Sequence, residues 1–403
     1  MRVAVVGGGP AGMMAAYAAA RSHEVWLFEK NEKLGKKLFI TGKGRCNLTN
    51  SAEIESFFSS VCRNAKFLYS AFYQFTNQDL MAVLEKNGLK LKEERGGRVF
   101  PASDKSSDVI KTLERMLRSA GVTIRLHAHV EKILARDGRI AGLVVNGDKM
   151  PFDKVILATG GYSYPLTGST GEGHEMAQKL GHTIEQIHPS LIPLVSPDPI
   201  CKQLQGLALK NVSLALMEGK KRCYCEQGEM LFTHFGVSGP LVLSASAHIG
   251  DYCFADTKIE LDLKPALSTE QLDRRILRDF EELKGKQLKN VMPKLFPKAL
   301  GIEILKKIGL SGEIPVGEVS KAQRGELVQI TKALPIKISG ARSIHEAIIT
   351  RGGVRIREVN PSTMESRKIS GLFFAGELLD LDAYTGGFNL QIAFSTGYLA
   401  GMS

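Results

Sequence analysis

The residues of this chain that are best suited to chemistry surround one cysteine. Cys46 directly follows Arg45, and Lys43 lies three positions before it. Neighbouring cations favour the thiolate form of a cysteine, which is the reactive form. Cys46 and Arg45 are therefore candidate catalytic residues, and a small buried packing residue is the equal alternative for Cys46.

Three other side chains are candidates for moving a proton or holding an anion. His234 in "LFTHFG" is the histidine best suited to general acid–base work, with a structural histidine as the alternative. Tyr384 in "DAYTGG" either stacks on a substrate or closes a turn. Arg98 in "GRVFP" suits an anionic substrate or the phosphates of a cofactor. The sequence does not rank these candidates.

The stretch that contains the cysteine, "LGKKLFITGKGRCNLTN" (Leu34–Asn50), has the glycines and lysines of a phosphate-binding loop. A Walker loop needs four residues between its glycines and a Ser or Thr after the lysine, to hold Mg²⁺. Here six residues separate Gly35 from Gly42, and Gly44 follows Lys43. The stretch is not a Walker loop, and its function depends on the elements around it.

The N-terminal residues predict a dinucleotide-binding unit. An apolar strand, Val3–Val6, leads into Gly7, Gly9 and Gly12 in the spacing G-x-G-x-x-G, then into an alanine-rich helix and a second strand that ends in Glu29. The glycines allow a tight turn, close approach of a pyrophosphate and helix–strand packing, while the helix N-terminus attracts phosphate. The acid suits ribose hydroxyls, so the sequence predicts an α/β, Rossmann-like domain.

Later segments indicate which dinucleotide is bound. A strand at Val155–Ala158 ends in Thr159-Gly160-Gly161, and a late strand ends in Gly376-Glu377 before a last helix that opens after Gly386-Gly387. This order resembles the FAD domain of the two-dinucleotide-binding flavoproteins. The resemblance implies that Glu377 holds the flavin ribitol and that the last helix points at the pyrimidine edge of the flavin ring. Simple turn chemistry is the alternative for these glycines.

Several motifs together resemble one bacterial family of NAD(P)/FAD-dependent oxidoreductases with aminoacetone-oxidase-like members. They are "LGKKLFITGKGRCNLTN", "GRVFP", "LFTHFGVSGP", "TRGGV" and "GELLDLDAYTGGFN". The resemblance covers essentially the whole chain and implies that Leu34–Asn50 lies along the flavin. The implied FAD-binding set is Gly7, Gly9, Pro10, Ala11, Gly12, Glu29, Lys30, Lys37, Thr41, Gly42, Arg45, Cys46, Asn47, Val130 (at the adenine), Thr159, Gly160, Gly161, Gly376, Glu377, Gly386, Gly387, Phe388 and Asn389.

The overall composition indicates where the protein acts and which partners it binds. The 403 residues are 43% hydrophobic and 24% charged, with a net charge of +11. No apolar run approaches a membrane span, and the chain starts with a strand-like run, which favours a cytoplasmic protein without membrane contact. The six cysteines form no C-x-x-C pair, so we expect no metal site. The positive charge favours a polyanionic partner, with a solvated basic surface as the alternative.

The succession of sequence patterns along the chain predicts two domains and a helical subdomain. The proline-rich "HPSLIPLVSPDP" interrupts the Rossmann pattern, β-like runs follow, and a helical pattern begins at the capping-type Ser268. We expect an FAD domain at residues 1–190 and 340–403. An inserted β-rich, barrel-like domain is expected at 191–267 and 331–339, with a small helical subdomain at 268–330.

Two chemistries remain open at this stage. Members of the similar family are linked to reduction of uridine to dihydrouridine in large-subunit ribosomal RNA, and others to small-molecule oxidation or steroid-like reduction. We favour uridine reduction in 23S RNA, because residues 264–342 carry sixteen Lys or Arg against nine Asp or Glu. Oxidation of a small amine such as aminoacetone, or reduction of another C=C bond, is the alternative. A second nucleotide-binding motif is absent, so NADPH or NADH is expected only as a transient electron donor.

Overall fold

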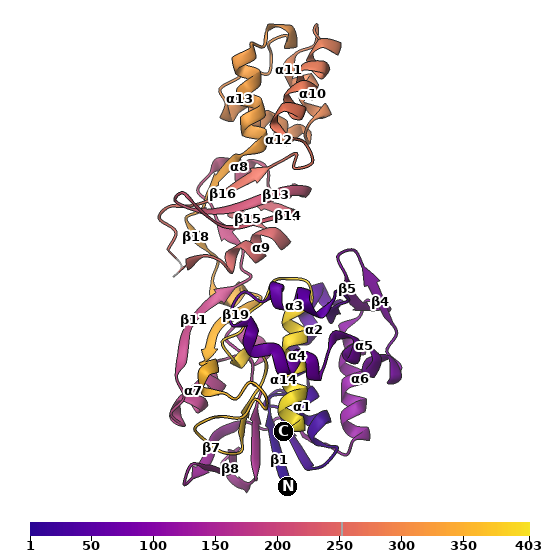
Figure 1. The fold of residues 1–403 in the computed structure, drawn as a ribbon, viewed down its shortest axis with the longest axis vertical. Coiled ribbons are helices and arrows are strands. Elements are labelled where there is room, and N and C mark those ends of the chain that lie inside the picture. Colours follow the sequence, from indigo (N-terminus) through magenta and orange to yellow (C-terminus); the bar gives the residue numbers. More distant parts are fainter. Residues whose placement is uncertain (251–252) are drawn as a thin grey trace. The chain divides into compact units, whose positions relative to one another are not determined.

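The computed structural model describes residues 1–250 and 253–403 and divides them into two compact units (Figure 1). Unit 1 consists of Met1–Ser190 and Ser343–Ser403, and unit 2 is Leu191–Arg342. Each unit has its own sheet and its own buried core.

Unit 1 is built on a five-stranded parallel sheet in the order β20-β10-β1-β2-β6. Its strands are β1 (Arg2–Val6), β2 (Glu24–Phe28), β6 (Thr123–Arg125), β10 (Lys154–Leu157) and β20 (Leu372–Phe374). The central strands are continuous apolar runs because both faces of a parallel sheet are covered. All carboxyl ends lie at one edge, where open α/β sheets bind ligands. The predicted Rossmann-like class is confirmed.

Two helices of unit 1 lie side by side and in the same direction. A Cβ at Gly397 of α14 (Phe388–Met402) would lie 2.2 Å from the Ala11 oxygen of α1 (Pro10–Ala19), and one at Gly401 would lie 2.3 Å from the Ala15 oxygen. Figure 1 shows the two helices together in the middle of the unit. With a rise of about 1.5 Å per residue, the N-terminus of α14 projects roughly 12 Å beyond that of α1.

The other elements of unit 1 surround this centre. A three-stranded sheet joins β3, β5 and β4, another joins β7, β8 and β9, and β11 pairs with β19. The strands are β3 (Thr49–Asn50), β4 (Leu91–Glu94), β5 (Arg98–Pro101), β7 (Val130–Arg136), β8 (Arg139–Val145), β9 (Asp148–Pro151), β11 (Ile184–Ser190) and β19 (Ile349–Val354). The helices are α2 (Lys36–Ile40), α3 (Ile54–Ser60), α4 (Tyr69–Gln74), α5 (Asn77–Lys86), α6 (Ser106–Ser119) and α7 (Glu172–Lys179).

Unit 2 contains a seven-stranded antiparallel sheet in the order β17-β16-β13-β14-β15-β12-β18 and a group of helices. Its strands are β12 (Leu194–Val195), β13 (Ala208–Glu218), β14 (Lys221–Thr233), β15 (Gly236–Ser238), β16 (Thr257–Asp262), β17 (Leu334–Lys337) and β18 (Gly340–Ala341). Its helices are α8 (Pro199–Gln203), α9 (Pro240–Ser246), α10 (Thr269–Glu282), α11 (Leu288–Val291), α12 (Lys298–Lys307) and α13 (Lys321–Lys332).

The start of the helical pattern in unit 2 is confirmed at Ser268. Its hydroxyl accepts from the Gln271 amide at 3.2 Å, and the Gln271 side chain accepts from the Ser268 amide, which together form a capping box. Among the helices of the described residues, none is both long and apolar enough to span a membrane.

Candidate functional site

The glycine turn after β1 has the shape that a pyrophosphate requires. A Cβ at Gly7 would lie 2.5 Å from the Ala158 oxygen, and a Cβ at Gly12 would lie 1.9 Å from the Gly7 oxygen. A Cβ at Gly9 would meet nothing within 4 Å, and Pro10 follows as the first residue of α1. The first and third glycines are therefore needed for packing, while the second faces open space at a helix N-terminus that favours an anion.

Glu29 lies beside this turn at the end of β2. Its carboxylate accepts hydrogen bonds from the Gly8 amide at 2.8 Å and from the amide and side chain of Asn31 at 2.8 and 2.7 Å. The side chain is buried, and its two oxygens have four lone-pair positions between them. The carboxylate is thus fixed in one orientation and can still accept from the hydroxyls of a ribose.

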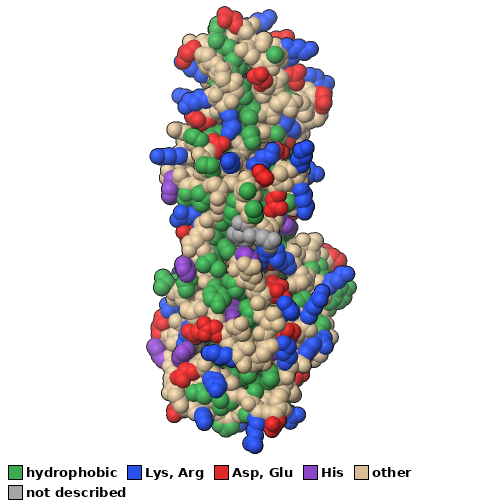
Figure 2. Space-filling view, turned by 90° about the vertical axis from the view of Figure 1, so that its left-hand side faces the viewer, with side chains coloured by type: hydrophobic (Ala, Val, Ile, Leu, Met, Phe, Trp, Pro, Cys, Tyr) green, Lys and Arg blue, Asp and Glu red, His purple; other side chains and the backbone are tan. Residues whose placement is uncertain are grey.

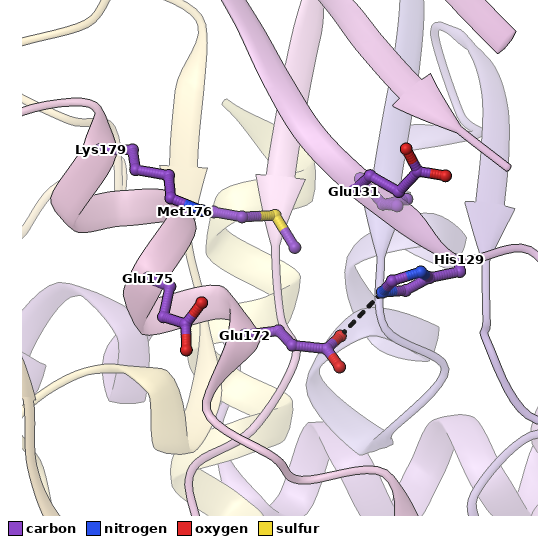
Figure 3. A pocket seen from close by; sticks show the side chains of 7 residues that line it. His129, Glu131, Glu172, Glu175, Met176 and Lys179 are labelled. Atoms are coloured by element: carbon purple, nitrogen blue, oxygen red, sulfur yellow. Dashed lines mark hydrogen bonds and ion pairs between the residues drawn. The ribbon is translucent and has the colours of Figure 1, made fainter. Parts of the chain in front are cut away.

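A shallow pocket of about 180 Å³ lies between the start of β7 and helix α7, and Val130 is among its lining residues (Figure 3). In that view His129 and Glu172 point toward one another, with 3.3 Å between His129 Nε2 and a Glu172 oxygen. The ammonium of Lys30 contacts Glu172 at 2.9 Å and donates to the Thr170 hydroxyl at 2.8 Å. The predicted adenine residue Val130 therefore lines this pocket, and Lys30 of the predicted FAD-binding set is connected to the pocket through Glu172.

A polar network follows the carboxyl ends of β10 and β20. Lys37 donates to Glu377 at 2.6 Å and to Ser163 at 2.7 Å. The other oxygen of Glu377 accepts from the Ser163 hydroxyl and the Thr350 amide, both at 2.7 Å. The first half of Leu34–Asn50 is thereby tied to the late acid, 340 residues away. The expected contact of Glu377 with a ribitol stays a prediction.

Two members of this network were missed by the sequence analysis. Ser163 follows the predicted Thr159-Gly160-Gly161 turn, and Thr350 begins the "TRGGV" motif. A Cβ at Gly161 would lie 2.3 Å from the Thr350 hydroxyl, and one at Gly376 would lie 2.8 Å from the Ala11 Cβ. The hydroxyl of Thr159 is buried and has no hydrogen-bond partner among the described residues. The sequence signal that could have identified Ser163 and Thr350 is a serine or threonine next to each glycine motif.

The second half of Leu34–Asn50 lies at the N-terminus of α14. With its amide oriented to satisfy all three contacts, Asn47 accepts from the Gly387 amide at 3.1 Å and donates to the Val99 and Thr49 oxygens. Asn50 donates to the Gly386 oxygen at 3.1 Å, and a Cβ at Gly387 would lie 2.3 Å from the Thr49 oxygen. The stretch therefore connects the glycine turn, the Glu377 network and the N-terminus of α14.

The expected thiolate of Cys46 is wrong. The side chain is fully buried, and burial raises the pKa of this thiol to about 12, against a small opposing effect from Thr41. Thr41 itself donates to the Leu38 oxygen at 2.7 Å, and Gly42 beside it has a positive φ of 57°. The packing interpretation of Cys46 fits this environment, and a catalytic function of its neutral thiol stays a prediction.

Arg45, next to this cysteine, is held by acids of other segments. Its guanidinium contacts Glu94, donates to Asp104 at 2.7 Å and lies 4.3 Å from the centre of the Phe100 ring. The contact with Arg45 holds the pKa of the Glu94 carboxyl below its usual range, and Lys92 together with Arg45 does the same for the pKa of Asp104. The contacts of Arg45 fix the loop in place, and a catalytic function of Arg45 stays a prediction.

The two other catalytic candidates lie in different units. Tyr384 belongs to unit 1, where its amide donates to the Ser60 oxygen and its own oxygen accepts from Asn389 of α14. His234 is exposed in unit 2, where its ring packs edge-on against Phe235. Phe388, at the start of α14, packs edge-on against Phe57 at 5.0 Å. The catalytic functions of Tyr384 and His234 stay predictions.

A buried histidine of unit 1 makes its stability pH-dependent. His174 is 2% exposed, stacks on Tyr162 at 5.3 Å and contacts the Leu378 oxygen at 3.2 Å through Nε2. Burial lowers its pKa from 6.5 to about 4. Since the folded pKa lies below the unfolded one, the stabilisation is complete above pH 6.5 and is lost as the pH falls toward 4. A shift of this size corresponds to roughly 3 kcal/mol.

We therefore expect acidification from pH 7 to 4.5 to lower the unfolding temperature of unit 1 more in the wild-type protein than in His174→Phe. Phenylalanine keeps a ring against Tyr162 and cannot be protonated. The measurement is thermal unfolding across this pH range, compared between the two proteins. Equal pH dependence would show that His174 does not contribute.

The residues of unit 1 fit FAD on structural grounds. Two uncapped helix N-termini, of α1 and α14, lie roughly 12 Å apart along one axis, and the Lys37–Glu377 network lies near the start of α1, where Gly376 approaches Ala11. That spacing suits a cofactor with an anionic pyrophosphate at one end and a polar ring at the other. The described residues contain no cluster of three or more His, Cys, Asp or Glu that could hold a metal ion.

Comparison with known families agrees with this fit. Residues 1–403 match the family described as the HI0933-like protein Rossmann domain. The chain belongs to this family of FAD-binding proteins, and it is an FAD-dependent oxidoreductase. The predicted family and enzyme class are thus confirmed.

Curated relatives cover almost the whole chain. It is 34% identical over 407 residues to the 3-dehydro-bile acid delta(4,6)-reductase of Clostridium scindens, covering 99% of this chain and 98% of that protein. It is 29% identical to the ribosomal RNA dihydrouridine synthase of Haemophilus influenzae, covering 99% and 97%. The protein of that name from Escherichia coli is 28% identical, with 98% and 95% covered.

A solved structure shows the same fold. The 3-ketosteroid-delta4-(5alpha)-dehydrogenase of Rhodococcus jostii RHA1, in complex with 4-androstene-3,17-dione, aligns with a TM-score of 0.54 at 16% identity. The alignment covers 100% of this chain and 96% of that one.

Proposed function

We propose that this oxidoreductase reduces a C=C bond conjugated to a carbonyl, and that the bond belongs to a uracil ring of 23S ribosomal RNA. FAD supplies the hydride when it is bound and reduced. The curated relatives support the reaction class, because their names describe reduction of such a bond in a bile acid or in RNA uridine. NADPH or NADH is the proposed electron donor.

The charge of unit 2 supports an RNA substrate. Residues 264–342 have sixteen cationic against nine acidic side chains. In Figure 2 lysines and arginines are spread among acidic side chains over the visible face of this unit rather than gathered in one patch. The exposed lysines of this region are Lys284, Lys286, Lys289, Lys294, Lys298, Lys306, Lys307, Lys321 and Lys337. Each phosphate that they neutralise adds a salt-dependent contribution to affinity.

The residues of unit 1 provide the remainder of the proposed function. The glycine turn and Glu29 bind the adenosine diphosphate half of FAD, and the Lys37–Glu377 network orients the other half. The target base leaves its stack to reach the ring, as in other enzymes that act on single bases.

Deletion of the gene is expected to remove dihydrouridine from 23S RNA. The measurement is nucleoside mass spectrometry of 23S RNA from cells with and without the gene. Wild-type protein expressed from a plasmid should restore the modified nucleoside, and the Gly9→Glu variant should not, because it cannot hold FAD. An unchanged RNA profile in the deletion strain would contradict the RNA substrate.

A small molecule with the same bond is the second candidate, because the bile acid reductase shares 34% identity with this chain. Anaerobic mixing of the reduced holoenzyme with 4-androstene-3,17-dione tests it through flavin reoxidation. Rapid formation of peroxide from aminoacetone in air would instead identify an amine oxidase.

A further inference from the structure

A buried aspartate that the proposed function has not used lies at the N-terminal end of α14. Asp382 is 1% exposed and belongs to the segment between Gly376-Glu377 and the helix. The next residue, Ala383, makes two hydrogen bonds to the side chain of Asn389. Its amide donates to Asn389 Oδ1 at 2.9 Å, and its main-chain oxygen accepts from Asn389 Nδ2 at 2.7 Å. Asn389 is in the first turn of α14. The carboxyl is thus held at the helix end that the flavin ring is expected to approach.

The two oxygens of this carboxyl have different surroundings. Oδ2 accepts from the Ser190 hydroxyl at 2.7 Å, while Oδ1 is buried and has no hydrogen-bond partner among the described residues. Leaving such an atom without a partner costs about 1–3 kcal/mol, so proteins rarely keep one without a use. A proton on Oδ1 turns this atom into a donor for a group that binds beside it.

The charged neighbours of Asp382 shift its pKa in opposite directions. Arg63 and Arg351 favour the carboxylate of Asp382, while its burial and the acid Asp380 oppose it. Burial is the largest effect and raises the pKa of Asp382. The Cys62 thiol lies beside the same carboxyl, and burial raises the pKa of this thiol as well, so it remains neutral.

Asp380 differs from Asp382 in its partners. Burial raises its pKa, with Glu185 acting in the same direction, while Asn64, Arg63 and the Gly352 amide oppose the increase. Asn64 donates to the Asp380 carboxylate at 3.1 Å. Asp380 is therefore a neighbouring acid with a hydrogen-bonded carboxylate, which makes it a suitable control.

We propose that Asp382 is the proton donor for the reduction, with Arg63, Arg351 and the Ser190 hydroxyl stabilising the carboxylate that remains. The inference rests on the proposed function, which supplies reduced FAD as the reductant. Hydride adds to one carbon of the C=C bond, and the electron pair of that bond moves toward the conjugated carbonyl. The neighbouring carbon then takes the proton from Oδ1, and solvent reprotonates Asp382. The C=C π bond, the O–H bond of Asp382 and the N–H bond of the reduced flavin that carries the hydride break, two C–H bonds form, and the flavin is left oxidised.

The test is Asp382→Asn in the FAD-loaded enzyme. Asparagine has the same shape and still accepts from Ser190, but it has no acidic proton. We expect normal FAD content, normal anaerobic reduction of the flavin, and reoxidation by 23S RNA from the deletion strain, or by 4-androstene-3,17-dione, that is slower by about 10²–10⁴-fold. Asp380→Asn removes an influence on Asp382 that is smaller than burial and keeps the proton donor, so it should slow reoxidation far less than Asp382→Asn does. Equal reoxidation rates in wild type and Asp382→Asn would overturn the proposal.

A second measurement needs no turnover. The infrared band of a protonated carboxyl should be present in the wild-type protein at pH 7, weaker in Asp382→Asn and retained in Asp380→Asn. If the band were lost in Asp380→Asn and kept in Asp382→Asn, the proton would belong to Asp380, and the proposal would be overturned. If the wild-type enzyme reduces neither 23S RNA nor 4-androstene-3,17-dione, the proposed function is wrong. A wild-type infrared spectrum without the Asp382 band would reject the proton-donor inference independently of that result.

Discussion

Gly9→Glu yields a folded protein that does not retain FAD. A Cβ at Gly9 meets nothing within 4 Å, and the residue has a negative φ of −79°, so the unliganded fold accepts a side chain there. A glutamate fills the space in front of α1 and adds a negative charge where the pyrophosphate would meet the helix N-terminus. The purified variant should be colourless, whereas the wild-type protein should be yellow.

Two comparisons separate this effect from misfolding. Thermal unfolding of the variant should match that of wild-type protein freed of FAD, and added FAD should raise the unfolding temperature of the wild type only. Gly9→Ala is the matched comparison, because it adds a Cβ without charge, and it should retain more FAD than Gly9→Glu does. Retention of FAD by Gly9→Glu would show that the pyrophosphate lies elsewhere.

Gly397→Ala should destabilise unit 1 and weaken FAD binding together. The new Cβ would lie 2.2 Å from the main-chain oxygen of Ala11, which has no freedom to rotate away. The helices α1 and α14 would have to separate, at a cost of typically about 1–3 kcal/mol for overpacking. Both helix N-termini would then move, which disturbs the two ends of the cofactor site.

The control for this substitution is Gly325→Ala in α13 of unit 2. A Cβ at Gly325 meets nothing within 4 Å, so alanine should stabilise its helix by about 0.5–1 kcal/mol. Thermal unfolding followed by flavin fluorescence reports on unit 1, and circular dichroism reports on the whole chain. A Gly397→Ala protein as stable as wild type would show that the helices are not in close contact.

Much of the fold could be predicted because its signals are local. The strand, glycine turn, helix and acid of the first 29 residues are contiguous, and Gly7 and Gly12 have a steric reason in the structure. The same holds for the glycine pair before α14 and for the capping box at Ser268. The resemblance of these motifs to those of known flavoproteins led to the FAD-binding class without tertiary information.

The environment of individual side chains could not be predicted in this way. The sequence places Cys46 among cations, which suggested a thiolate, yet Arg45 is paired with Glu94 and Asp104 from segments 49 and 59 residues away. The sulfur itself is buried, and burial raises its pKa. A charge close in sequence has little effect when distant acids neutralise it and the thiol lies away from water.

The sequence by itself determined three features: the cofactor class, the order of the glycine and acid motifs that follow the strands, and the two helices whose N-termini follow a glycine motif. Only the tertiary structure decided that Lys37 meets Glu377 across 340 residues and that the charges of Arg63 and Arg351 act on the buried Asp382. The physical reason is that a turn is specified by the conformations of adjacent residues. Partners and proton affinity depend instead on which distant groups and how much water surround an atom.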